Sequence, residues 1–242
     1  MRETPQARNI DFAGLARDRL EDMHDAAAEV LACQRALAKS GTSVVREVLR
    51  DQGDFVTWQS YPRGDVYDAE THSQYFYHAH APADMVDGEH GHFHTFLRPA
   101  AFGFSPAVPP DPAKAADPAA LVSHLIAISV DARGMPFRLF TTNRWVTGET
   151  WYLAADVLAM LDRFNVDLAL PNWAVSRWVT GMVRLFRPQI EVLVTARDAA
   201  MDDWVAGHPG EDVYEDRRLQ VTSEVGIDVT GQIRRIEAAL GL

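Results

Sequence analysis

The spacing of apolar residues predicts helices in the first part of the chain. From Ile10 to Ala38 the apolar positions recur with helical periodicity, and Gly41 is placed to end the helix. Thr42 or Ser43 can cap a second, shorter helix that ends before Gly53. Residues 1–52 are therefore expected to form a helical hairpin.

The pattern changes in the middle of the chain to short segments rich in aromatic and β-branched residues. Turn-forming residues separate these segments, among them Pro62-Arg63-Gly64-Asp65 and Asp131-Ala132-Arg133-Gly134. Residues 100–120 hold five prolines, which favours a surface connection and makes this the best candidate for a mobile loop. The predicted strands, mostly in meander order, are Phe55–Tyr61, Ser73–His80, His90–Arg98, Leu121–Val130 and Pro136–Arg144.

Helical periodicity returns after Gly148 and continues almost to the end of the chain. The predicted elements are helices at Thr150–Phe164, Pro171–Pro188 and Leu193–Trp204, a strand at Arg218–Ser223 and a helix at Gly231–Leu240. Sheet segments flanked by helices indicate an α+β fold with a central antiparallel sheet of about five strands. We expect a single domain, 1–242, with a helical part (1–52), a sheet part (53–146) and a mainly helical part (147–242).

Histidines gather in two of the predicted strands. Five of the nine histidines of the chain lie within 17 residues, and these are His78, His80, His90, His92 and His94. Alternate residues of a strand point to the same side, and a hairpin that places His80 opposite His90 brings both sets to one side of the sheet. We call this side the histidine face, and we expect all five imidazoles to converge there.

The positions between these histidines are mostly apolar. They would form an opposite face that packs on helices, made of Tyr75, Tyr77, Ala79, Phe93, Thr95 and Leu97. This division of polar and apolar residues between two faces is what separates the cluster from chance composition.

Imidazoles at this spacing can close on one metal ion. Three or four ligands from rigid strands, with metal–nitrogen bonds of about 2.0 to 2.1 Å, would suit Zn, Fe, Cu or Ni. The cluster contains no cysteine, which disfavours a purely structural zinc site. Five imidazoles exceed the need of one tetrahedral ion, so one of them could be an outer partner, a proton shuttle or a ligand of a second ion.

Other ionisable residues have several interpretations. Glu89 adjoins the cluster and is the candidate catalytic acid or base; it could equally be a carboxylate ligand or a solvated loop residue. The residues on the same side of the predicted strand as His124 are apolar. This favours a histidine buried in the core over a sixth metal ligand. His24 and His208 are expected to be structural or exposed.

Composition and charge exclude several classes of protein. The chain has 23 Lys and Arg against 34 Asp and Glu, and its formal charge of -11 would repel nucleic acid. The single cysteine, Cys33, excludes an intramolecular disulfide and fits a reducing cytosol. No apolar run reaches the roughly 18 residues needed to span a bilayer, so we expect a cytoplasmic protein without a membrane partner.

Three motifs resemble an uncharacterised bacterial family described only as a domain of unknown function. They are Tyr61-Pro62-Arg63-Gly64-Asp65-Val66-Tyr67-Asp68, Ser73-Gln74-Tyr75-Phe76-Tyr77-His78-Ala79-His80 and Glu89-His90-Gly91-His92-Phe93-His94, and the resemblance covers Tyr61 to Trp145. Such a family implies no activity.

A looser similarity is to cupins, in which His-X-His is followed within a few residues by Glu. Here His92-Phe93-His94 is followed by Arg98 at that place, and two histidine-bearing strands replace one. The similarity implies only histidine ligands on adjacent strands.

The sequence thus favours a metalloenzyme that acts on a small molecule. A three-histidine ion with an open position could activate water for hydrolysis, or bind dioxygen if it is iron or copper. A metal-binding or storage protein in which histidines fill every position is the alternative, and a scaffold of stacked histidines without metal is a third. An open coordination position on the metal ion would distinguish the enzyme from the storage protein.

Overall fold

The computed structural model describes residues 3–110 and 112–242 and shows an α+β fold. Its described residues form one six-stranded sheet in which every neighbouring pair is antiparallel and the strands follow chain order, β1 to β6. The strands are β1 (Tyr61–Asp68), β2 (Ser73–His78), β3 (Gly91–Leu97), β4 (Ser123–Val130), β5 (Pro136–Thr142) and β6 (Val221–Gly226). The predicted meander is confirmed, with one strand more than expected.

Helices precede the sheet strands, separate some of them and follow the last one along the chain. The α-helices are α1 (Pro5–Arg8), α2 (Arg17–Lys39), α3 (Val44–Val48), α4 (Pro112–Ala115), α5 (Arg144–Thr147), α6 (Ala154–Leu161), α7 (Trp173–Leu185), α8 (Arg187–Gly207) and α9 (Val229–Leu240). Short 3-10 turns are η1 (Phe12–Gly14), η2 (Pro82–Asp84), η3 (Pro99–Phe102), η4 (Pro118–Ala120) and η5 (Val213–Glu215). No helix in the described ranges is both long and apolar enough to cross a membrane.

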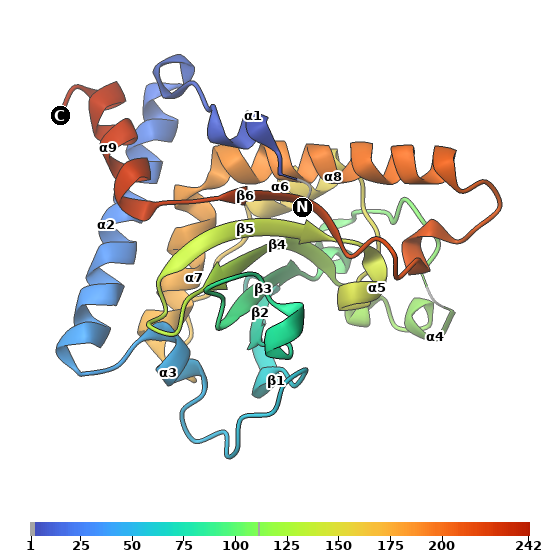
Figure 1. Cartoon of the computed structure of the whole chain (residues 1–242), viewed down its shortest axis with the longest axis horizontal. Coiled ribbons are helices and arrows are strands. Elements are labelled where there is room, and N and C mark those ends of the chain that lie inside the picture. The colour runs from blue at the N-terminus through green and yellow to red at the C-terminus, as the bar shows by residue number, and fades with distance from the viewer. Residues whose placement is uncertain (1–2, 111) are drawn as a thin grey trace.

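The opposite face of the sheet packs on α7, and α7 packs in turn on α2. The ring of Trp178, from α7, lies 5.4 Å from that of Phe93, and the Tyr75 hydroxyl lies 3.2 Å from the Ser176 hydroxyl. Figure 1 shows α7 between the sheet and α2. Burial of these aromatic rings anchors the sheet on α7.

The hairpin of β2 and β3 has the register that the histidine pattern predicts. His78 lies opposite His92 and Phe76 opposite His94, so His80 would face His90 if both strands continued. Directly opposed residues share a side of the sheet, which places the three strand histidines on the histidine face.

The first predicted strand, Phe55–Tyr61, is wrong. The strand β1 begins where that segment was expected to end, and it contains the predicted turn Pro62-Arg63-Gly64-Asp65. Gly64 and Asp65 have positive φ angles of 88° and 58°, and the register shifts between Tyr61 and Val66. The turn-forming residues therefore form a bulge within β1. The extra residues of a bulge bend a strand without ending it.

Several other boundaries differ from the prediction, among them the start of α8, which begins at Arg187 and not at Leu193. The long N-terminal helix begins at Arg17 because the segment before it forms η1, capped by the Asp11 side chain. The last strand is β6 and lies a few residues later than the predicted Arg218–Ser223. It pairs with β5, so a segment from the C-terminal part of the chain completes the sheet.

Candidate metal centre

Three buried histidines of the central hairpin bring their ring nitrogens together. His78 comes from β2, and His92 and His94 come from β3. One ligand atom from each lies within 4.8 Å of the others, and the Nε2 atoms of His78 and His92 are 2.7 Å apart. Ligand atoms around a tetrahedral ion with bonds of about 2.0 to 2.1 Å are about 3.4 Å apart, so small ring movements suffice to place all three. The trio could hold a metal ion.

Glu89 orients one of these rings. Its Oε1 atom lies 2.9 Å from His92 Nδ1, so the carboxylate accepts the Nδ1–H and leaves the Nε2 lone pair of His92 directed at His78. Burial opposes ionisation of Glu89, but the contacts with His92, Ser129 and Arg138 outweigh it and lower the pKa of the carboxyl group. Glu89 is therefore a buried carboxylate beside a candidate ligand, not a solvated loop residue.

His124 orients a second ring, although parity along β4 predicts otherwise. His94 Nδ1 lies 2.9 Å from His124 Nε2, while His94 Nε2 is buried without a hydrogen-bond partner. In β4, Ile126 pairs with Thr95 and His124 pairs with Phe96, so Leu125 is an extra residue. This bulge reverses the alternation of faces and turns His124 onto the histidine face.

The centre is enclosed by aromatic rings and small residues. Phe76 packs on the rings of His78 and His94, at centroid distances of 5.5 and 5.2 Å, and Phe140 packs edge-on against His92 at 5.1 Å. On β4, Ala127 lies opposite His94 and Ser129 opposite His92, which leaves room above the rings. Small residues on the neighbouring strand thus give the imidazoles their space.

Burial keeps His78, His94 and His124 in the neutral form, which is the form that binds metals. It lowers the pKa of His78 to about 2 and that of His124 to about 3, and it also lowers the pKa of His94 well below the usual range. Neighbouring imidazoles add to the effect at His78 because two positive charges at this distance repel each other.

His80 lies next to the trio but outside it. Its ring centroid is 4.9 Å from that of His78 and 5.1 Å from that of His92, and its Nε2 atom is buried without a hydrogen-bond partner. The indole of Trp58 stacks on it at 4.1 Å with an interplanar angle of 17°. The expected convergence on the histidine face therefore includes His80 as a neighbour.

His90 lies apart from the other four clustered histidines. Its Nδ1 atom is 2.5 Å from the hydroxyl of Tyr77, a residue of the opposite face, and its ring also contacts Phe55. A Cβ at Gly91 would lie 2.3 Å from the Tyr77 hydroxyl, so only glycine lets this phenol reach past the strand end. The prediction that His90 lies on the histidine face is wrong. Side chains alternate between faces only within a strand, and β3 begins after His90.

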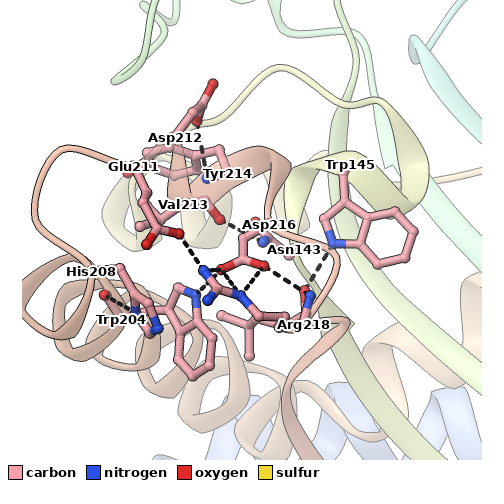
Figure 2. A network of polar contacts seen from close by, with 11 residues as sticks. Asn143, Trp145, Trp204, His208, Glu211, Asp212, Val213, Tyr214, Asp216 and Arg218 are labelled. Carbon is pink, nitrogen blue, oxygen red and sulfur yellow. Dashed lines mark hydrogen bonds and ion pairs between the residues drawn. The ribbon is translucent and has the colours of Figure 1, made fainter.

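The remaining histidines lie in other contexts, as the sequence predicts for two of them. Figure 2 shows His208 beside Trp204 in a polar network around Asp216 and Arg218, with His208 Nδ1 2.9 Å from the Trp204 carbonyl. His24 is half-buried on α2. His72 precedes β2, has a φ angle of 59° and contacts the Tyr67 hydroxyl.

A second buried carboxyl group supports the strand that carries His124. Glu149 Oε2 accepts the backbone N–H of His124 at 2.8 Å, and Glu149 Oε1 is buried without a partner. Burial raises the pKa of Glu149 to about 7. This contact holds the start of β4, and no signal in the sequence connects the two residues.

Comparison with protein families places the chain. A family model described as a domain of unknown function (DUF6969) matches residues 24–227. The chain belongs to this family. The match extends well beyond Tyr61 to Trp145, the range over which the sequence motifs resemble an uncharacterised family. Comparison with curated proteins and with solved structures gave no match.

Proposed function

We propose that the protein is a transition-metal enzyme in which His78, His92 and His94 hold Zn, Fe, Cu or Ni. The observation that carries this proposal is the orientation of two of the three rings, His92 and His94, by outer partners. Glu89 accepts from His92, and His124 contacts His94, so that the Nε2 atoms remain for a metal ion. Histidine ligands in metalloproteins characteristically use their second ring nitrogen in this way.

The buried and unpartnered Nε2 atom of His94 supports the same conclusion. A buried polar atom without a hydrogen bond costs about 1 to 3 kcal/mol, and a metal bond would satisfy it. Water alone could fill this role, but burial also keeps His78, His80, His94 and His124 in the neutral form, by lowering the pKa of each, and neutral imidazole is the form that binds a metal ion.

Three histidines leave a coordination position for substrate or water, which favours an enzyme. An ion held in this way can lower the pKa of a bound water for hydrolysis, and iron or copper can support oxidation. The neighbours of Glu89 support an orienting role for this residue; its use as a catalytic acid or base stays a prediction. The substrate is expected to be a small molecule. A cytoplasmic location stays a prediction from composition, and a bacterial origin stays a prediction from the resemblance of the motifs.

The alternative is a storage or carrier protein with a closed site. The buried Nε2 atom of His80, beside the trio, favours this reading, because a fourth imidazole would complete a tetrahedron without substrate.

Metal analysis of protein purified without a histidine tag tests the proposal. We expect close to one transition-metal ion per chain, and a higher melting temperature with the bound metal than without it. The variants His78→Ala, His92→Ala and His94→Ala should lose the metal, while the control variants His24→Ala and His208→Ala should keep it. Circular dichroism of each variant separates loss of metal from loss of fold. Metal-free protein that shows no thermal shift with any of the four metals would overturn the proposal.

A further inference from the structure

We propose that His80 is a conditional fourth ligand of the metal centre and that Trp58 positions it away from the ion. This inference rests on the proposed metal site and concerns what fills its open position. Trp58 would then decide whether the site is open, as an enzyme needs, or closed by a fourth imidazole.

His80 has a ring nitrogen that could bind a metal ion, but this nitrogen is not among those that lie together in the trio. Its buried Nε2 atom has no partner, and its ring adjoins those of His78 and His92. Only His78, His92 and His94 nevertheless bring ligand atoms within 4.8 Å of one another among the described residues. His80 also lies two residues beyond the end of β2, so its backbone is not fixed by the hydrogen bonds of that strand.

Trp58 is the contact that fixes the His80 ring. The two rings are nearly parallel at 4.1 Å, an arrangement in which stacked aromatic groups attract each other. The Trp58 backbone N–H donates to the carbonyl of Ala79, the residue before His80, at 2.8 Å. One residue therefore holds both the ring and the chain segment that carries it.

The conformation of Trp58 indicates that this contact has a cost. Its φ angle is 70°, in the left-handed region that non-glycine residues seldom adopt, and its side chain is 59% exposed. A large apolar ring in water and a strained backbone are stabilised here by the stack on His80 and the bond to Ala79. Such strain is found where a residue is held in place for a function.

Removal of the stack would free His80 to rotate toward the trio. Its Nε2 atom would then replace a water molecule on the ion and complete a set of four imidazole ligands. The indole thus keeps one coordination position free for substrate.

Cobalt substitution tests this inference, because azide binds an open position on Co²⁺ and changes its visible absorption. We expect Co²⁺-loaded wild-type protein to bind azide. The Trp58→Ala variant should bind Co²⁺ about tenfold more tightly and azide about tenfold more weakly. The Trp58→Ala/His80→Ala double variant should regain azide binding, and Trp58→Phe, which can still stack, should behave like wild type.

The controls distinguish this inference from the proposed function. Trp173→Ala removes another half-exposed indole, at the start of α7, and should leave both affinities unchanged. If wild-type protein binds no Co²⁺, the proposed metal site itself fails. If Co²⁺ binds but Trp58→Ala equals wild type, only the role of Trp58 fails. If His80→Ala weakens Co²⁺ binding as much as His92→Ala does, His80 is a permanent ligand and the inference is overturned.

Discussion

At the scale of single residues, the histidine face is organised by which ring nitrogen each imidazole keeps free. Glu89 and His124 each occupy the Nδ1 side of a ring, so that the Nε2 side of His92 and His94 faces the centre. A ring that could adopt either tautomer would spend part of its time with a proton where the metal should bind. The outer contacts would therefore pre-organise these two rings for the proposed metal ion.

Replacing the orienting carboxylate should weaken metal binding without unfolding the protein. The Glu89→Gln variant keeps the shape of the side chain but removes the charge that fixes the proton on His92 Nδ1. We expect metal affinity to fall about 10- to 100-fold, measured by competition with a coloured chelator. Asp87→Asn, which neutralises an exposed carboxylate of the same loop, is the matched control. Equal losses in the two variants would show that net charge, not orientation, is responsible.

At the scale of elements, the site depends on a rigid sheet backed by tightly packed helices. The helices α7 and α2 lie close together at Gly181, where an added Cβ would lie 2.8 Å from Val30 Cγ2 and 3.4 Å from the Ala26 carbonyl. Both of these residues are fully buried, so neither can move aside into solvent. The glycine sets the distance between the two helices.

A larger side chain at this position should separate the helices. We expect Gly181→Val to lower the free energy of unfolding by about 1 to 3 kcal/mol, because overpacking forces side chains and backbone apart. Gly207→Ala, at the open end of α8, has no atom within 4 Å of the added Cβ and should change stability by less than about 1 kcal/mol. Urea denaturation of both variants measures the difference. Equal stability of Gly181→Val and wild type would mean that α2 and α7 can move apart freely.

At the scale of the whole molecule, the fold must keep several imidazoles neutral in its interior. Burial lowers the pKa of His80 to about 4 and that of His78 to about 2, whereas an unfolded histidine titrates at about 6.5. Below about pH 6.5 the unfolded chain therefore binds more protons than the native chain, and stability falls as the pH falls. Glu149 has the opposite effect, because burial raises its pKa to about 7 and the native state favours its protonated form.

Metal-free protein should therefore lose stability in mild acid. Between about pH 6.5 and 4.5 each histidine kept neutral contributes a loss of about 1.4 kcal/mol per pH unit, partly offset by Glu149. The Glu149→Gln variant lacks this offset, so its stability should decline more steeply with falling pH and exceed that of wild type at about pH 8. Urea unfolding of chelator-treated protein over this range measures both curves. A stability that is flat from about pH 6.5 to 4.5 would show that these histidines are not buried in solution.

The sequence by itself determined the fold class, the meander order and the register of the central hairpin. These follow from local patterns, since alternation along a strand and the position of its turns fix which residues share a face. The pairing of His78 with His92 and the packing of Tyr75 and Phe93 on helices needed no further information.

Tertiary structure alone decided which histidines belong to the site. The bulge at Leu125 places His124 on the histidine face. The Tyr77 hydroxyl contacts the ring of His90, and the indole of Trp58 stacks on the ring of His80. Each of these outcomes depends on a contact outside the regular repeat of a strand, either at a bulge or beyond a strand end. Alternation carries information only within an unbroken strand, so the set of histidines that meet could be decided only when the whole chain had packed.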